Sequence, residues 1–214
     1  MKQHISCLVF LGVAACATAT APEVNALSVD ALKTLPNQTY VLEPGQVAMT
    51  FVAKPRLFPA IQGSFSNFGG SVEITDAASS SIAIHAVVDL QSVEIPSEIY
   101  ENTIRSPAFF DVENHPEAIF EGELDGWRGE GLGAVQGLLT IRGVTRPAQF
   151  DIRLNCNGIP ACPQSQVGFD GTLEINRSEF GMDRYSGFVK DKVSFMISGT
   201  LITAPEHIAD AAKP

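Results

Sequence analysis

The sequence predicts an all-β domain of antiparallel strands, and three observations lead to that prediction. Several segments alternate apolar and polar residues with the period of two that is typical of half-buried strands. Gly, Asp and Ser residues between these segments, as at Asp125-Gly126 and Ser186-Gly187, indicate turns. Only one segment, residues 97–105, has a helical pattern. The composition of the 214-residue chain, 45% hydrophobic and 18% charged, is that of a globular domain with a sizeable core.

The first element along the chain is an export signal, and we assign residues 1–26 to this signal and the start of a linker. Lys2 precedes an apolar stretch, residues 5–15, that is too short to span a bilayer as a helix. Small residues at 17–19 and at 24–26 each fit a signal-peptidase site. A third alternative is a lipobox, Val13-Ala14-Ala15-Cys16, in which Cys16 becomes the lipidated first residue. The three alternatives stay open.

About eight strands are expected after a polar linker near Pro22 to Pro36. In residues 167–175, Val167 and Leu173 fall on one face while Asp170 and Thr172 fall on the other. The same alternation recurs in residues 81–90, 150–154 and 193–201. Strands with one apolar face must bury it, either between two facing sheets or inside a barrel. Periodicity alone does not choose between these two architectures.

The helical segment lies between Pro96 and Pro107. Ser97 is the expected N-cap, and Ile99 and Thr103 share a face. Because the segment is short, we expect a lid or a cross-connection and not a second layer. The residues after the last strand, 204–214, are expected to form a tail.

Charge and cysteines restrict the function and the compartment. The net charge of −10 stays with the mature domain, because Lys2 and Glu23 cancel, and it argues against nucleic-acid binding. Cys156 and Cys162 are the two cysteines left after export, and an oxidising compartment predicts a disulfide between them across a turn. A metal site would need further ligands nearby, and a redox site would favour a C-x-x-C spacing.

Catalytic motifs are missing from the sequence. The four His residues show no ligand spacing, and neither a Gly-x-Ser-x-Gly elbow nor a Gly-rich phosphate loop occurs. We therefore predict a protein that is not an enzyme and that needs no metal or cofactor. An isomerase or a hydrolase is the catalytic alternative.

Three segments in order carry a family resemblance. They are Ser106-Pro107-Ala108-Phe109-Phe110-Asp111-Val112, continuing to Phe120; Leu139 to Pro147, with Arg142-Gly143 inside it; and Ile175-Asn176-Arg177-Ser178-Glu179-Phe180-Gly181-Met182. Together they resemble the YceI-like family of bacterial periplasmic proteins, over about residues 38–203. The chain departs from the family pattern at Gly45-Gln46, at Pro55 and at Tyr100-Glu101. These departures concern the head group of a ligand and not the fold.

The resemblance implies an eight-stranded lipocalin-like antiparallel barrel with one short helix. It implies an apolar pore that sequesters or carries a long isoprenoid lipid, such as a polyprenyl phosphate or an isoprenoid quinone. It also implies a place in the periplasm, or on a membrane anchor facing it, a role in stress response and a possible homodimer. The alternative is a filled barrel that binds a protein partner in the envelope without lipid.

Six Phe residues are the candidates for lining the pore: Phe109, Phe110 and Phe120 first, then Phe65, Phe68 and Phe169. The plainer interpretation is that they fill the core. Neighbours in a strand point to opposite sides, so Phe109 and Phe110 need two apolar environments. Gly171 and Gly199 on apolar faces are expected to leave room for a cavity. Four polar residues of the family-like segments are interpreted as turn or loop residues in preference to ligand contacts: Arg142, Arg146, Asn176 and Arg177.

Overall fold

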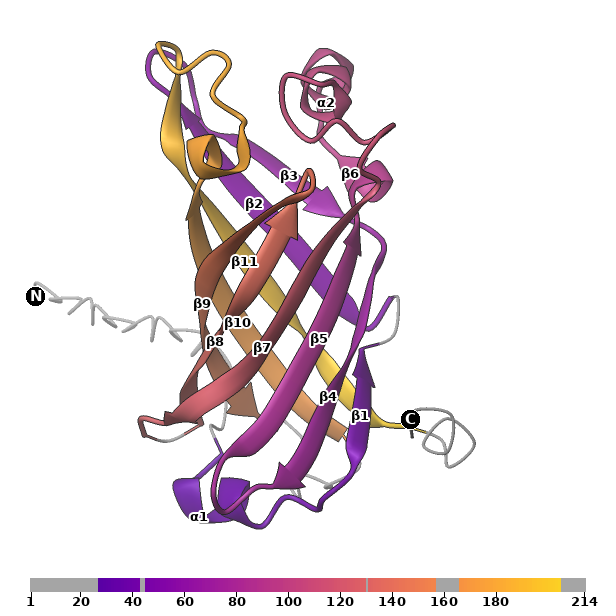
Figure 1. The fold of residues 1–214 in the computed structure, drawn as a ribbon, viewed down its shortest axis with the longest axis vertical. Coiled ribbons are helices and arrows are strands. Elements are labelled where there is room, and N and C mark those ends of the chain that lie inside the picture. The colour runs from indigo at the N-terminus through magenta and orange to yellow at the C-terminus, as the bar shows by residue number, and fades with distance from the viewer. Residues whose placement is uncertain (1–26, 43–44, 130, 157–165, 205–214) are drawn as a thin grey trace, which may run out of the picture.

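The computed structural model describes residues 27–42, 45–129, 131–156 and 166–204. Figure 1 shows a tall barrel of tilted strands with short helices at its ends. In chain order the elements are α1 (Val29–Lys33), β1 (Thr39–Leu42), β2 (Val47–Pro55), β3 (Ile61–Phe65), β4 (Phe68–Asp76), β5 (Ser81–Asp89), η1 (Leu90–Ser92), β6 (Val93–Glu94), α2 (Glu98–Arg105), β7 (Glu117–Trp127), β8 (Leu132–Ile141), β9 (Val144–Asn155), β10 (Gln166–Asn176), η2 (Arg177–Phe180) and β11 (Val189–Thr203).

Eight of the strands close into a ring, which confirms the predicted eight-stranded antiparallel barrel. The order around the ring is β1-β4-β5-β7-β8-β9-β10-β11, and β1 completes it by pairing with the end of β11, where Tyr40 lies opposite Thr203. The earlier part of β11 pairs instead with β2, from Val193–Ala53 to Gly199–Val47. β2 and β1 therefore pair with successive parts of the same long strand, β11. β2, β3 and β6 continue the sheet toward the end of the barrel that carries α2.

The strands alternate as their sequences predict. Along β10, Val167 and Leu173 are buried, whereas Asp170 and Thr172 face solvent on the outer surface. His85 is exposed on the outer face of β5, while Ile82 and Val88 are buried on the inner face. The β8–β9 hairpin turns at Arg142 and Gly143, whose φ angles are 54° and 70°. Positive φ at both central residues marks a type I′ turn, in which Gly143 costs no steric strain.

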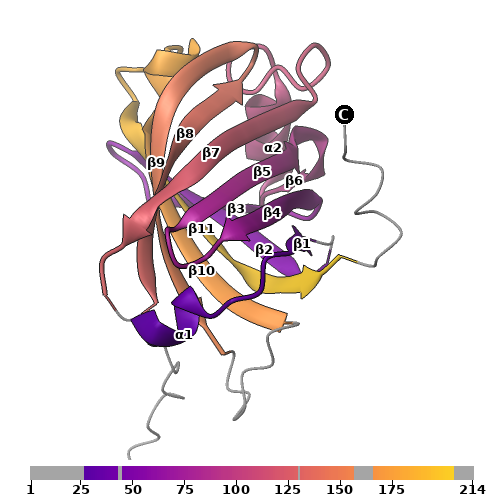
Figure 2. The ribbon, with the colours of Figure 1, turned by 60° about the horizontal axis from the view of Figure 1, so that its bottom comes forward.

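One end of the barrel is covered by α1, and here the prediction of a polar linker is wrong. Leu32 is fully buried and Leu35 is 7% exposed. The backbone N–H of Leu27 donates to the carbonyl of Leu154 at 3.3 Å, which fixes the segment against β9. Figure 2, with the bottom of Figure 1 brought forward, shows α1 at this end. Three leucines in nine residues make the segment an apolar cover.

The other end carries α2, which begins one residue after Ser97. Ser97 is the N-cap residue, as predicted, but its hydroxyl makes no capping hydrogen bond. The Ser97 carbonyl instead accepts from the backbone N–H of Glu101 at 2.9 Å. No residue of α2 is fully buried, and Ile99 is 77% exposed, whereas Thr103 on the same face is half-buried.

Some predictions fall on residues outside the described ranges. Cys16 and Cys162 lie there, as do the export signal and almost all of the tail. Cys156 follows β9 and is half-buried. The lipidation of Cys16 and the Cys156–Cys162 disulfide therefore stay predictions.

Candidate binding cavity

The barrel encloses a cavity of about 140 Å³. Every strand of the ring contributes to its wall, and the lining runs from Leu35 beside α1 to Phe110 and Ile141 near α2. One buried water needs roughly 10–15 Å³, so the cavity is several times larger than a single water site. Along β7 the lining extends from Ala118 to Trp127, a path of roughly 30 Å at the rise of a strand.

The wall of the cavity is apolar. None of the described residues that line it carries a charge, and the phenol of Tyr40 is one of its few polar groups. Tyr40 is fully buried, and this burial raises the pKa of its phenol above the ordinary value. Water gains few hydrogen bonds in such a space, so a dry apolar occupant is favoured.

Aromatic rings lie along the wall because glycines make space for them. A Cβ on Gly122 would stand 2.6 Å from the ring of Phe120, and one on Gly137 would stand 2.8 Å from it. The Phe120 ring therefore rests over the backbone of β7 and β8. Its edge meets Phe150 with ring centroids 4.6 Å apart. This placement keeps a large side chain in the wall and leaves the centre of the barrel open.

A cluster of four Phe residues stands at the α2 end of the cavity. The ring centroid of Phe51 lies 5.6 Å from that of Phe65 and 6.1 Å from that of Phe195, and Phe65 lies 5.8 Å from Phe110. Phe51 is 1% exposed and does not line the cavity. Phe65, Phe110 and Phe195 therefore form the cavity wall at this end, and Phe51 packs against Phe65 and Phe195 outside the lining.

Five of the six predicted Phe residues line the cavity: Phe65, Phe68, Phe110, Phe120 and Phe169. The structure brings these five together from four strands and one loop. Their contact with a ligand stays a prediction.

Phe109 does not line the cavity, contrary to the sequence-based expectation. Its ring stacks on Tyr185 with centroids 6.0 Å apart, and the guanidinium of Arg177 lies 5.7 Å from its centroid. The two neighbouring Phe residues do occupy two environments, because Phe110 reaches the cavity and Phe109 reaches the loop after η2.

The two glycines expected to leave room behave differently. Gly171 lines the cavity, and a Cβ there would have its nearest neighbours at 3.9 Å, an ordinary van der Waals distance, so the site has room for it. A Cβ on Gly199 would stand 2.6 Å from the carbonyl oxygen of Gln46. The expectation for Gly199 is therefore wrong, because the backbone that leads into β2 occupies its space.

Several lining residues were not singled out in the sequence. Phe150 and Ile152 have the period-two pattern of their strand, which shows a buried face but not a cavity. Tyr40 and Trp127 lie near strand ends, where alternation is too short to assign a face. Leu35 was missed because its segment was interpreted as a linker.

The three family-like segments meet at the α2 end, where Arg142 joins them, and the first two also give Phe110, Phe120, Leu139 and Ile141 to the cavity wall. Arg142 of the second segment donates to the carbonyl of Pro107 in the first at 3.1 Å and to that of Gly181 in the third at 2.6 Å. Arg146 is exposed and donates to the carbonyl of its neighbour Thr145. Arg142 therefore ties three loops together.

Arg177 organises the loop between η2 and β11, as its interpretation as a loop anchor predicts. It is 2% exposed, and burial lowers the pKa of its guanidinium from the ordinary value. The side chain donates to the carbonyl oxygens of Met182, Arg184, Val189 and Lys190. Asn176 donates to the carboxylate of Glu179 at 3.0 Å and not to backbone.

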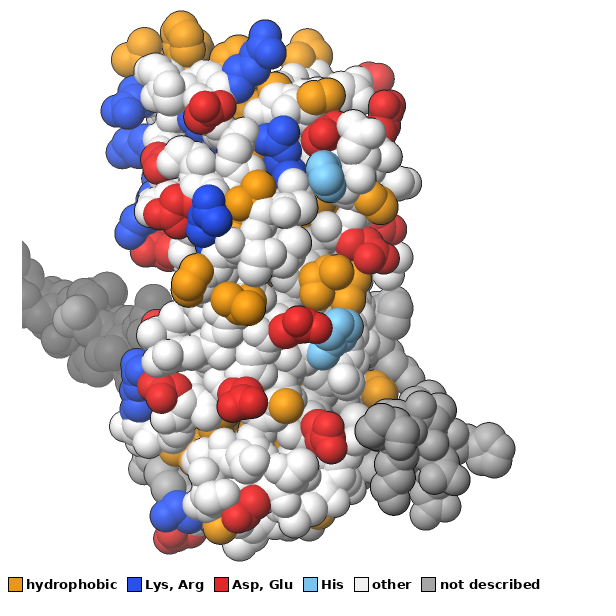
Figure 3. All heavy atoms as spheres, viewed as in Figure 1, with side chains coloured by type: hydrophobic (Ala, Val, Ile, Leu, Met, Phe, Trp, Pro, Cys, Tyr) orange, Lys and Arg blue, Asp and Glu red, His pale blue; other side chains and the backbone are white. Residues whose placement is uncertain are grey.

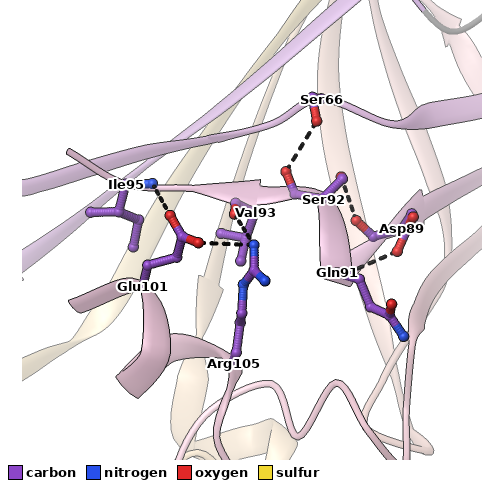
Figure 4. Close-up of polar contacts among 8 residues, drawn as sticks. All are labelled: Ser66, Asp89, Gln91, Ser92, Val93, Ile95, Glu101 and Arg105. Carbon is purple, nitrogen blue, oxygen red and sulfur yellow. Dashed lines mark hydrogen bonds and ion pairs between the residues drawn. The ribbon is translucent and has the colours of Figure 1, made fainter. Parts of the chain in front are cut away.

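Polar contacts hold α2 to the barrel (Figure 4). Arg105 pairs with Glu101 at 2.9 Å and donates to the carbonyl of Val93 at 2.9 Å. Glu101 also accepts from the backbone N–H of Ile95 at 3.3 Å. Glu101 is one of the positions where the chain departs from the family pattern, and here it fastens the helix to β6.

The described residues gather no group of three His, Cys, Asp or Glu side chains that could hold a metal ion. Within the same ranges, no helix has the length and hydropathy needed to cross a bilayer. That the chain is not an enzyme stays a prediction.

A family model for the YceI-like domain matches residues 40–201. A UPF0312 protein of Serratia proteamaculans is 28% identical over 138 residues, which cover 64% of this chain and 71% of that protein. A UPF0312 protein of Yersinia pestis is 25% identical over the same shares of the two chains.

Solved structures share the fold. BcnA of Burkholderia cenocepacia superposes with a TM-score of 0.65 at 22% identity, over 74% of this chain and 98% of that one. The YCEI protein of Campylobacter jejuni gives a TM-score of 0.60 at 19% identity, over 71% and 90%. A polyisoprenoid binding domain from Saccharophagus degradans gives 0.59 at 12% identity, over 79% and 100%.

Proposed function

The chain belongs to the YceI-like domain family, and on this premise we propose that it binds a long apolar lipid inside its barrel. The observation that carries the proposal is the cavity of about 140 Å³ with its apolar wall. Moving apolar surface out of water contributes about 25 cal/mol per Å². A preformed apolar space gains that free energy without ordering a new site.

Within the lipids, we propose an isoprenoid tail. The structural neighbour of this chain from Saccharophagus degradans is described as a polyisoprenoid binding domain, which supports this class of lipid. The wall mixes branched aliphatic side chains with flat rings, as at Ile84, Phe120 and Phe150. Such a wall suits a tail that alternates methyl branches with planar double bonds. Neither chemistry nor charge in the cavity selects the head group.

We further propose that the protein works in the bacterial envelope. The apolar stretch at residues 5–15 and the candidate cleavage sites after it support export. Lipidation of Cys16 would add a membrane anchor, and the Cys156–Cys162 disulfide would fit an oxidising compartment.

Filling the cavity tests the proposal. Gly171→Phe places a ring in the open space beside Gly171, whereas Thr172→Phe adds the same ring on the outer face of β10. The quenching of Trp127, which lines the cavity, by an isoprenoid quinone reports binding. We expect Gly171→Phe to weaken binding at least about tenfold, equal to about 1.4 kcal/mol, and Thr172→Phe to leave it unchanged.

Equal quinone affinity for the Gly171→Phe variant and the unaltered chain would place the ligand outside the cavity. Failure of the unaltered chain to bind long-tail quinones, polyprenyl phosphates or fatty acids would favour the filled-barrel interaction protein. Conversion of the quinone during the titration would favour the enzyme alternative.

A further inference from the structure

Two neighbouring loops form a projecting tip at the α2 end of the barrel. One loop joins β2 to β3, and the other joins η2 to β11. The backbone N–H of Arg56 donates to the carbonyl of Phe188 at 2.8 Å, and Val189 lies opposite Pro55 in the sheet. These contacts fix the two loops side by side.

The tip exposes large apolar side chains to solvent. Leu57 is 84% exposed, Phe188 69%, Phe58 67% and Tyr185 47%. Figure 3 shows hydrophobic side chains gathered at the top left of the molecule, over the ends of β2 and β11. Apolar residues that project together from two loops are costly in water, and such exposed patches mark interaction sites. We call these four residues the apolar tip.

Basic side chains surround the apolar tip. Lys54, Arg56, Arg184 and Lys190 are all exposed at the bases of the two loops, and we call them the basic collar. None of the four forms an ion pair within the part of the chain that the structure describes. A chain with a net charge of −10 thus collects unpaired cations at one place.

Nearby acids are partly engaged elsewhere. Asp191 accepts hydrogen bonds from the backbone N–H and hydroxyl of Ser178, at 2.9 and 2.8 Å. Glu174 accepts from Lys192 at 2.6 Å. Asp183 is exposed in the same loop as Arg184 and offsets part of the collar.

Ile99 and Tyr100 of α2 are also exposed at this end, and acidic side chains lie beside them in the chain. Glu98 and Glu101 stand on the same helix, and Glu94 ends β6. The two sides of this end therefore differ in sign. An anionic surface would attract the tip and repel the helix.

We propose that the apolar tip and the basic collar dock the protein on an anionic lipid bilayer. Leu57, Phe58 and Phe188 enter the boundary between head groups and acyl chains, while the collar meets lipid phosphates. The convex shape of two loop tips fits a fluid surface that closes around them, and the collar selects anionic head groups. The proposal does not depend on the cavity holding a lipid.

Local tryptophan quenching by brominated lipids tests the proposal in the full chain. Phe58→Trp places a tryptophan in the tip, and Ala78→Trp places one in the exposed β4–β5 turn at the opposite end. The chain has one tryptophan, Trp127, so its signal in the unaltered chain is the reference. With vesicles of phosphatidylglycerol and phosphatidylcholine, we expect the added tryptophan to be quenched in Phe58→Trp and not in Ala78→Trp. Because this readout is local, an anchor at the N-terminus does not imitate it.

Charge reversal tests the collar. The double substitution Lys54→Glu/Lys190→Glu should weaken the affinity for anionic vesicles, measured by tryptophan quenching, at least about tenfold. The reason is that each cation near the membrane surface contributes to the attraction. Lys33→Glu/Arg153→Glu changes the net charge equally but lies near the α1 end, and it should change affinity less than about twofold. An unquenched tip, equal binding to pure phosphatidylcholine vesicles, or equal effects of both double variants would overturn the proposal. An unquenched tip would also make a protein partner the better candidate for this surface.

Discussion

At the residue scale, glycines decide where the barrel is hollow. Gly122 and Gly137 lie opposite each other on β7 and β8, and the ring of Phe120 occupies the space that their side chains would take. Gly171 has no such neighbour, so the space beside it belongs to the cavity. One residue type thus gives a ring in the wall at one place and open volume at another.

Gly137→Ala tests the close packing of the wall. Its Cβ would stand 2.2 Å from the carbonyl oxygen of Glu121 and 2.6 Å from the Cα of Gly122, so backbone must move. We expect a loss of about 2 kcal/mol in the free energy of unfolding, measured by urea denaturation. Gly187→Ala, where a Cβ meets no atom within 4 Å, is the control and should lose less than about 0.5 kcal/mol. Similar losses in both variants would contradict the close contact at Gly137.

Tyr40 predicts how stability changes at alkaline pH. Burial raises the pKa of its phenol in the folded state, so the folded chain keeps its proton where the unfolded chain loses it. This contribution to stability is complete below the ordinary tyrosine pKa, near 10, and is lost as the pH rises through that value and beyond. Tyr40→Phe should flatten the fall in unfolding free energy above about pH 10. An unchanged slope in this variant would show that Tyr40 does not carry the effect.

At the element scale, α2 is held by polar contacts and one half-buried isoleucine, and α1 by buried leucines. α2 buries none of its residues fully; Ile104 packs against the core, and Arg105 and Glu101 bind the backbone at Val93 and Ile95. α1 is shorter but buries Leu32 completely. Polar contacts that reach solvent are weak, so α2 should open more readily than α1.

Arg105→Ala tests the attachment of α2. The change removes the pair with Glu101 and the hydrogen bond to the Val93 carbonyl. We expect faster hydrogen exchange in residues 98–105, with the global unfolding free energy lowered by only about 1 kcal/mol. Exchange in β7–β9 serves as the internal control and should not change. Unchanged exchange in α2 would mean that other contacts hold the helix.

The two helices also show what sequence alone can predict about an element. Prolines at 96 and 107 bracket α2, and its predicted range is nearly that of the structure. The N-cap position of Ser97 was predicted correctly, but a serine at that position need not turn its hydroxyl toward the helix. α1 was missed because one turn of helix has too few residues to show a period. The burial of the leucines in and beside it depends on the end of the barrel, which the local sequence does not show.

At the scale of the whole molecule, the closure of the ring depends on contacts between distant residues. Alternation in β10 and β11 predicts a buried face, but the pairing of β1 with the end of β11 is not visible in either segment. The prediction of a barrel came from the resemblance of three segments to a known family. Those segments meet through Arg142, whose carbonyl partners on Pro107 and Gly181 do not line the cavity, so this shared contact indicates the fold and not the ligand.

The candidate site, like the closure of the ring, could be predicted only in part, because it also depends on contacts between distant residues. Alternation in residues 167–175 puts Phe169 on the apolar face with Val167 and Leu173, and these three residues line the cavity. The prediction that Phe109 lines the cavity was wrong because the residue lies in a loop, where no periodicity fixes the direction of a side chain. Whether an inner face is filled or hollow depends on packing between strands that are far apart in sequence, as Gly171 and Gly199 show.

The most direct measurement is native mass spectrometry of the protein purified from its own host, followed by organic extraction of what it carries. We expect a lipid adduct that survives desalting, extracts as an isoprenoid and disappears in the Gly171→Phe variant. A bare polypeptide mass, unchanged after incubation with isoprenoid quinones and polyprenyl phosphates, would contradict a lipid-binding barrel.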